Sequence, residues 1–266
     1  MSSRQSRHAW RRFRPQVRVP IKSREELDIM RLAGRIVALT LRRLSEVIRP
    51  GVTTAELDRE AEDFIRSHSA VPSFKGLYGF PASICTSVNE EVVHGIPGPR
   101  RLVEGDIVSV DVGALIGGFH GDGAATLPVG EISDSARRLI QVTREALDRG
   151  IAKARSGNTV KDISGAVQSF VEANGFSVVR AYAGHGIGRK MHEDPQVPNF
   201  VVEADPDVTL VPGMTLAIEP MVNAGTWEVL VMPDGWTVVT ADSSLSCHFE
   251  HTVAVTQNGP EILTLP

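Results

Sequence analysis

Hydrophobic residues between positions 23 and 50 recur every three or four positions, which is the period of one face of an α-helix. Ser23 and Glu26 form the pattern of a capping box at the start of this stripe, and Pro50-Gly51 stops it. The pattern therefore predicts a long amphipathic helix. Its apolar positions are Leu27, Met30, Gly34, Val37, Leu41, Leu44 and Ile48.

Three further segments carry the helical period. They open at Thr53 or Thr54, at Ser133 or Ser135, and near Val160, and the last two end at Ser156-Gly157 and Asn174-Gly175. Gly175 follows its helix where a C-terminal capping glycine is expected. The expected inward residues are Leu57, Ala61 and Phe64 in the second helix and Leu139, Ile140, Leu147 and Ile151 in the third.

The first two predicted helices resemble the last two. A shift of 106 residues lays 49–53 on 155–159, and a shift of 108 lays 105–111 on 213–219. Two alignments with nearly the same offset, in the same order, indicate an internal duplication. We therefore predict an α+β fold in which two similar halves share one central antiparallel sheet. Asp111 and Glu219 are the matched acids of the two halves.

Asp111 and Asp122 lie in two strand patterns, Ile107–Leu115 and Phe119–Leu127. A two-residue turn at Ile116-Gly117 would place these aspartates directly opposite each other, with Cβ atoms about 5 Å apart. Facing carboxylates on an apolar hairpin are destabilising unless a cation lies between them. The alternative is that one aspartate faces solvent, because a register error of one residue would separate the two.

Glu219, Glu250 and His185 extend this acidic pair. Glu219 ends an apolar strand pattern, where an unpaired carboxylate would be costly, and Glu250 opens another. His185 lies in a glycine-rich segment that we expect to be a loop. One histidine among four carboxylates suits Mn, Fe, Co or Zn, and the carboxylates suffice to bridge two cations.

The composition excludes several classes of protein. The chain has 266 residues, 42% hydrophobic and 23% charged, with a net charge of −4, which argues against a specific nucleic-acid site. No run of about 18 apolar residues predicts a membrane span. Cys85 and Cys247 form no disulfide framework, and the N-terminus lacks the apolar region of a signal peptide, so we expect a cytoplasmic protein.

Residues 1–20 are rich in arginine and have no apolar period, so we predict a flexible basic leader. Docking on an anionic surface such as ribosomal RNA is the alternative for this segment. We predict a single domain over 21–266, with halves at about 21–128 and 129–266, in a monomer.

Several motifs together resemble the type I methionine aminopeptidases of bacteria. The resemblance covers the chain from about Ile21 to the C-terminus, in order and without large gaps, and each motif is far less specific than the set. The motifs are Ser87–Pro97, Asp111, Phe119–Asp122, Gly184–Arg189, Met191–Gln196, Ile218–Met221, Asp234–Thr237 and Phe249–Thr252.

The resemblance implies a pita-bread fold and roles for the residues above. Two divalent ions would be held by Asp111, Asp122, His185, Glu219 and Glu250, with Asp122 and Glu250 bridging. A metal-bridging hydroxide would attack the carbonyl after an initiator methionine that precedes a small residue. Glu219 would also move the proton, and His94 and His192 would bind the scissile peptide of a nascent chain.

The resemblance also implies a methionine pocket that departs from the commoner bacterial pattern. It would be formed by Cys85, Phe80, Leu77, Phe74, Met191 and Trp236. Leu77 and Phe80 stand where tyrosines are frequent in the family, and Phe74 stands where a cysteine is frequent. Met191 stands where phenylalanine is usual, and His248 where glutamine is usual. The pocket remains apolar, so methionine selectivity is expected to persist with a changed pocket shape.

Three alternatives remain from the sequence. An Xaa-Pro aminopeptidase or prolidase of the same fold usually carries an additional N-terminal domain. A non-catalytic pita-bread binding module typically lacks metal ligands, whereas all five are present here. A structural helix-sheet protein with solvated acids would not need four carboxylates at such positions.

Overall fold

The computed structural model describes residues 19–204 and 207–266. The predicted basic leader at 1–20 lies almost wholly outside the described residues. No helix within the described ranges is both long enough and apolar enough to cross a membrane.

The four predicted helices are all present. They are α1 (Arg24–Val47), α2 (Thr54–Ser67), α3 (Asp134–Lys153) and α4 (Val160–Ala173). Capping boxes start α1 at Ser23, α2 at Thr53 and α4 at Thr159. One expected inward residue is wrong, because α2 buries Ile65 completely and leaves Phe64 half-buried. The helical period allows either neighbour to face the sheet, and the packing of α2 selects Ile65.

The main sheet is antiparallel, with strands in the order β1-β4-β5-β14-β9-β7-β8; β2 also pairs with β4, and β15 with β14. Its strands are β1 (Val71–Pro72), β2 (Ile84–Val88), β4 (Ile107–Ile116), β5 (Phe119–Pro128), β7 (Ala183–Gly186), β8 (Glu193–Pro198), β9 (Thr215–Ile218), β14 (Glu250–Thr256) and β15 (Gly259–Ile262). In the central succession β4-β5-β14-β9, the first two strands come from one half and the last two from the other. The predicted alignment matches β4 with β9, so the two halves lie symmetrically in one shared sheet.

Two three-stranded sheets complete the described structure. One is formed by β13 (Ser246–His248), β10 (Met221–Asn223) and β6 (Ser177–Val178), and the other by β11 (Val229–Val231), β12 (Val238–Thr240) and β3 (Glu91–Val93). A short 3-10 turn, η1 (Leu77–Gly79), precedes β2.

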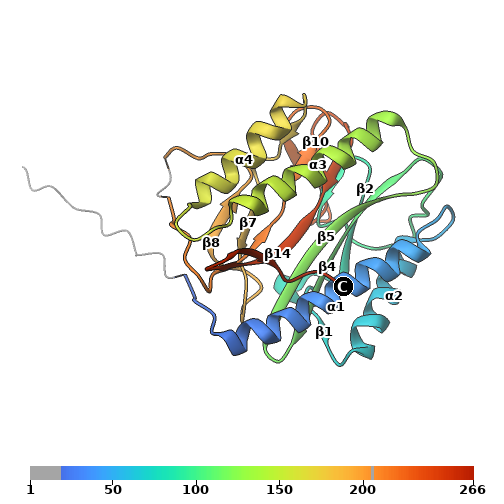
Figure 1. Ribbon diagram of the computed structural model, residues 1–266. Coiled ribbons are helices and arrows are strands. Elements are labelled where there is room, and N and C mark those ends of the chain that lie inside the picture. Colours follow the sequence, from blue (N-terminus) through green and yellow to red (C-terminus); the bar gives the residue numbers. More distant parts are fainter. Residues whose placement is uncertain (1–18, 205–206) are drawn as a thin grey trace, which may run out of the picture.

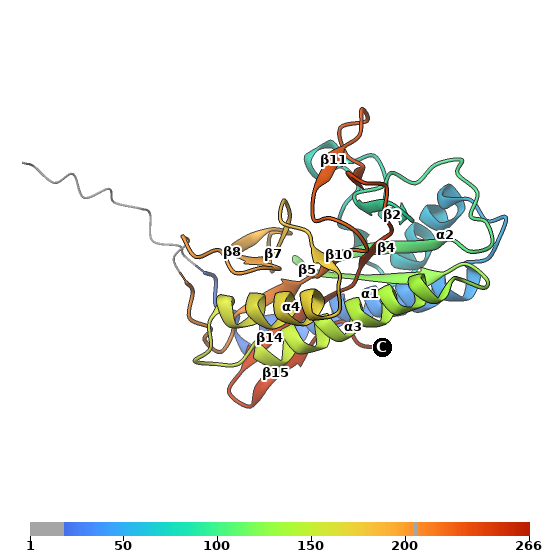
Figure 2. The same ribbon diagram turned by 90° about the horizontal axis from the view of Figure 1, so that it is seen from above.

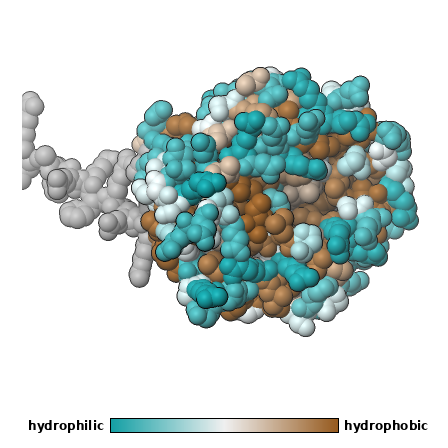
Figure 3. Space-filling model, in the orientation of Figure 1, coloured by the Kyte–Doolittle hydropathy of each residue, from teal (hydrophilic) through white to brown (hydrophobic). Residues whose placement is uncertain are grey.

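The helices pack against the main sheet, with α1 on β4 and β5 and with α3 on strands of the other half. Figure 2 shows α3 and α4 along one side of the molecule and β11 on the opposite side. In Figure 3 hydrophilic residues surround apolar ones near the middle of the face that it shows. Figure 1 shows α1 beside α2 and α3 beside α4 on different parts of the sheet. A separate apolar cluster lies under each of these two helix pairs.

Equivalent backbone hydrogen bonds recur in the two halves. Gly51 N–H donates to Leu102 O at 2.7 Å, and Gly157 N–H donates to Leu210 O at 3.0 Å. Gly105 and Gly213, which the alignment matches, have φ angles of 94° and 92°. These contacts fit an internal repeat with the predicted offsets, while the boundary between the halves stays a prediction.

The β4–β5 hairpin corrects the predicted register. Its turn is Gly117-Gly118, with φ angles of 58° and 79°, rather than Ile116-Gly117. A β-branched isoleucine is strained at positive φ, whereas glycine is not, so the turn moves by one residue. Asp111 consequently lies opposite Ala124, and Asp122 opposite Gly113. A register change of two residues keeps both aspartates on one face, as diagonal neighbours.

Gly34 allows α1 to lie directly against the C-terminal segment. A Cβ atom at this position would overlap the carbonyl oxygen of Leu263. Because that neighbour is backbone, it cannot move aside as a flexible side chain would.

We expect Gly34→Ala to lower the free energy of unfolding by about 3 kcal/mol, measured by urea denaturation, because the helix must shift. The matched control is Gly165→Ala in α4, where the added Cβ would lie 3.6 Å from Val201 Cγ2, an ordinary contact. Alanine stabilises a helix interior by up to about 1 kcal/mol over glycine, so the control is expected to be neutral or stabilising. Equal losses in the two variants would contradict the close packing of α1.

Candidate metal centre and substrate pocket

Five neighbouring strands of the main sheet each bring one candidate ligand to the same place. Asp111 lies on β4, Asp122 on β5, Glu250 on β14 and His185 on β7, and Glu219 directly follows β9. His185 therefore lies on a strand rather than in the predicted loop. Its glycine neighbours serve close packing, since a Cβ at Gly184 would overlap the carbonyl oxygen of Ala217.

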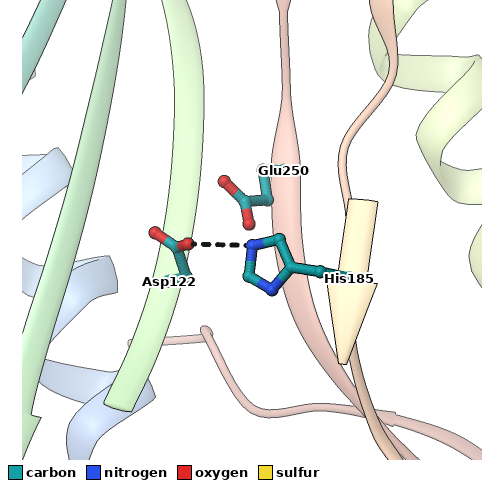
Figure 4. A group of neighbouring side chains, drawn as sticks. All are labelled: Asp122, His185 and Glu250. Carbon is teal, nitrogen blue, oxygen red and sulfur yellow. Dashed lines mark ion pairs between the residues drawn. The ribbon is translucent and has the colours of Figure 1, made fainter. Parts of the chain in front are cut away.

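Three of these side chains converge most closely. Ligand atoms of Asp122, His185 and Glu250 lie within 4.8 Å of one another, and all three residues are buried. Figure 4 shows the three side chains pointing toward a common centre from separate strands.

His185 presents an unprotonated nitrogen to the carboxylates. Its Nδ1 lies 2.8 Å from the carbonyl oxygen of Gly186, which can only accept, so Nδ1 carries the proton. Burial, with a smaller effect of His192, lowers the pKa of His185 to about 4, so the ring is neutral near pH 7. Its Nε2 then directs a lone pair at Glu219 Oε1, 3.6 Å away, and at Asp122 Oδ2, 3.7 Å away.

The buried acids need a positive charge. Burial raises the pKa of Asp111 to about 7. Burial, and then the neighbouring carboxylates, raise the pKa values of Asp122, Glu219 and Glu250 well above their usual range. One oxygen each of Asp111, Asp122 and Glu250 is buried without a hydrogen-bond partner in the described structure. Oxygen atoms and one imidazole nitrogen facing each other in this way fit a divalent cation.

A pocket of about 860 Å³ opens above the acids. It is lined by all of the predicted ligands and by every other predicted site residue: His94, His192, Cys85, Phe80, Leu77, Phe74, Met191 and Trp236. The structure therefore brings the whole predicted set to one cavity.

The apolar wall of the pocket is a packed cluster. Phe74, Phe80, Cys85 and Met191 are buried in it, and Trp236 packs its ring edge-on against Phe80 with 5.1 Å between centroids. Burial raises the pKa of the Cys85 thiol well above its usual value, so this side chain is a neutral, apolar part of the wall.

Aromatic contacts arrange His94 and His192, which line the pocket. His94 meets Tyr182 edge-on at 5.6 Å, and His192 meets His185 edge-on at 4.5 Å. Tyr78 stacks on His192 with 5.8 Å between ring centroids. The sequence did not single out Tyr78 or Tyr182. Nothing in the sequence around Tyr78 pairs this residue with His192, which is 114 positions away.

Residues 28–257 match the family model Peptidase_M24, metallopeptidase family M24. This chain belongs to metallopeptidase family M24. It is 58% identical over 245 residues to the methionine aminopeptidase of Clostridium perfringens, covering 92% of this chain and 98% of that protein. It is 54% identical to methionine aminopeptidase 1 of Bacillus subtilis, and the alignment covers 91% of this chain and 98% of that protein. The crystal structure of the methionine aminopeptidase from Rickettsia prowazekii superposes with a TM-score of 0.91 at 43% identity. The superposition covers 93% of this chain and 100% of that one.

Membership of family M24 confirms the predicted pita-bread fold and the prediction of a metal-dependent hydrolase. A non-catalytic module and a structural helix-sheet protein are thereby set aside. The family and the buried Asp122, His185 and Glu250 group together support divalent metal binding.

A buried ion pair supports the segment that carries His192. Lys22 Nζ lies 2.6 Å from Glu193 Oε2, and the side chains are only 3% and 7% exposed. Burial lowers the pKa of Lys22, against the opposing effect of Glu193. The Lys190 N–H also donates to Glu193 Oε1 at 3.1 Å. Glu193 therefore ties residues 190–193 to the start of the described chain.

We expect Glu193→Gln to lower the free energy of unfolding by about 3–5 kcal/mol, because the Lys22 ammonium stays buried without its counter-charge. The control is Glu145→Gln, which breaks the pair between Glu145 and Arg149 on side chains 45% and 52% exposed. That pair is expected to contribute at most about 1 kcal/mol. Chemical denaturation of both variants measures the difference, and similar losses would argue against the buried pair as a support.

Proposed function

We propose that this chain removes the N-terminal methionine from peptides and nascent proteins whose second residue is small. The observation that carries the proposal is the placement of one candidate ligand on, or directly after, each of five neighbouring strands, in a pocket with one apolar wall. Methionine aminopeptidases that cover nearly the whole chain at up to 58% identity support this substrate class.

We propose that two divalent ions, of Co, Mn, Fe or Zn, are held by Asp111, Asp122, His185, Glu219 and Glu250. Four carboxylates offset the charge of two such ions, which suits this donor set. When bound, divalent ions polarise a carbonyl group and lower the pKa of water.

The side chains around this centre have separate tasks in the proposal. Glu219, a carboxylate beside both His185 and the proposed cations, accepts a proton and passes it to the leaving amine. Burial lowers the pKa of His94 to about 4, so His94 acts as a neutral hydrogen-bond donor to the scissile peptide. His192, whose ring meets that of His185, holds the same peptide.

The methionine side chain occupies the apolar wall in this proposal. Phe80, Met191 and Trp236 offer apolar surface, and the neutral Cys85 thiol adds no charge. A flexible thioether packs well against aromatic rings. An unbranched side chain is therefore favoured over a β-branched one.

The remaining expectations from the sequence stay proposals. They are a single catalytic domain over 21–266, a monomer, a cytoplasmic location, and contact of the basic leader with the ribosome.

Release of the first residue from Met-Ala-Ser peptides, compared with Leu-, Ala- and Xaa-Pro peptides during a metal titration, tests the function. We expect cleavage of the methionine peptide only with added divalent ion. Equal cleavage of the Leu and Met peptides would contradict the specificity, and preference for Xaa-Pro peptides would favour a prolidase-like activity. Activity that survives full chelation would overturn the metal-dependent mechanism.

A further inference from the structure

His248 is a buried histidine that faces the metal centre without a partner. It is 2% exposed, lines the pocket, and has an Nε2 atom that makes no hydrogen bond in the described structure. Its neighbour on β13, Cys247, points the opposite way into the core of the second half. A buried polar atom left without a partner in a folded protein calls for an explanation.

The nearest charged group to His248 Nε2 is Glu219. The Nε2 atom lies 3.7 Å from Glu219 Oε2, while the other oxygen, Oε1, lies 3.6 Å from Nε2 of His185. The Glu219 carboxylate is therefore bracketed by two imidazole rings, one at each oxygen. No side chain within the described ranges donates a hydrogen bond to this carboxylate.

The two rings differ in what they can offer. His185 carries its proton on Nδ1, so its Nε2 has a lone pair and can bind a cation. Neutral His248 can carry its proton on Nε2 and donate it to an anion. A change of less than 1 Å in the 3.7 Å separation brings Nε2 and Oε2 into hydrogen-bond range.

The backbone of His248 is held in place from β5, the strand that carries Asp122. The His248 N–H donates to Thr126 Oγ1 at 2.9 Å, and the same hydroxyl donates to His248 O at 2.8 Å. Thr126 is fully buried and is also bonded to Ser109 Oγ at 2.8 Å. The ring is thus presented to Glu219 by a rigid part of the sheet.

We propose that His248 is a positioning residue of the metal centre, whose Nε2–H holds Glu219 Oε2 and thereby directs Oε1 toward the cation beside His185. A partner of this kind sets the orientation of a ligating carboxylate without binding the ion itself. This inference rests on the proposed metal-dependent function and adds a residue to it.

The test compares His248→Leu with His248→Gln. Leucine fills similar space without a donor, whereas the glutamine amide can donate a hydrogen bond to Glu219. His251→Gln is the control, because this neighbouring histidine bonds Thr264 Oγ1 at 2.7 Å instead of facing the pocket. Binding of Co²⁺ is measured by calorimetry, and the visible absorption spectrum of the Co²⁺ form is recorded for each protein.

We expect His248→Leu to weaken Co²⁺ binding by about 10–100-fold and to shift the Co²⁺ spectrum. His248→Gln and His251→Gln are expected to keep the wild-type affinity and spectrum. Unchanged binding in His248→Leu would overturn the inference. A loss in His248→Gln as large as in His248→Leu would also overturn it, since it would indicate direct coordination by the ring.

Nitrogen NMR of the wild-type histidine rings keeps the inference testable if His248→Leu does not fold. We expect His248 to carry its proton on Nε2 and its resonance to move when Zn²⁺ is added. A proton on Nδ1 instead would overturn the positioning role. Failure of the wild-type protein to bind any divalent ion would count against the proposed function itself, which separates the two results.

Discussion

Asp122→Ala is expected to lower kcat/KM for a Met-Ala-Ser peptide by at least about 10³-fold. The metal ligands act as one unit, so the remaining ligands cannot compensate for the loss of Asp122. Asp122 is 4% exposed, and its carboxylate lies within reach of both His185 and Glu250. Its backbone is fixed by Thr252, whose hydroxyl accepts from the Asp122 N–H at 3.0 Å. Steady-state kinetics with a saturating divalent ion measures the loss.

Asp106→Asn is the matched control for this substitution. Asp106 is also buried, at 7% exposed, but its oxygens accept from Asn89 Nδ2 at 2.8 Å and from the Val103 N–H at 2.9 Å, away from the pocket. This variant is expected to lose stability while keeping kcat/KM near the wild-type value. Activity in Asp122→Ala within about tenfold of wild type would rule out Asp122 as an essential ligand.

The helices could be predicted because their causes are local. Capping boxes at Ser23 and Thr159 and the apolar stripes lie within a few residues of each other. The shared site followed from the duplication, which matches Asp111 with Glu219. The hairpin register was wrong by two residues because it depended on which glycine could adopt positive φ. The prediction that Asp111 and Asp122 share one face of the sheet was still right, because side chains alternate with a period of two and the shift was two residues.

Contacts between distant segments could not be predicted from the pattern. Lys22 and Glu193 are 171 residues apart, and Tyr78 and His192 are 114 apart. Nothing within either segment indicates its partner. His185 was expected in a loop because glycines flank it, although those glycines allow a strand to approach its neighbours closely. For His248 the sequence showed an unusual residue type, but its position beside Glu219 required the fold.

Stabilisation of the protein by a divalent ion is expected to increase as the pH rises from 5 to 7.5. Without a cation, burial raises the pKa values of all four acids, that of Asp111 to about 7, and repulsion between the carboxylates adds to the rise for Asp122, Glu219 and Glu250. In the unfolded chain such groups titrate near pH 4. Between these values the native state binds more protons than the unfolded state, so the free energy of unfolding falls as the pH rises. The contribution of the protonated acids to the free energy of unfolding is therefore complete below about pH 4 and is lost as the pH rises through their native pKa values.

A bound cation reverses that trend, because it stabilises the ionised carboxylates. The thermal midpoint with excess Mn²⁺, minus that with chelator, is therefore expected to rise by roughly 5 °C or more from pH 5 to pH 7.5. A neutral histidine whose ring faces away from the pocket, such as His251 bonded to Thr264, acts equally in both samples and cancels from the difference. Glu250→Gln removes one of the acids and is expected to flatten the curve. A difference that is constant with pH, or larger at pH 5, would mean that the four carboxylates are not what the cation binds.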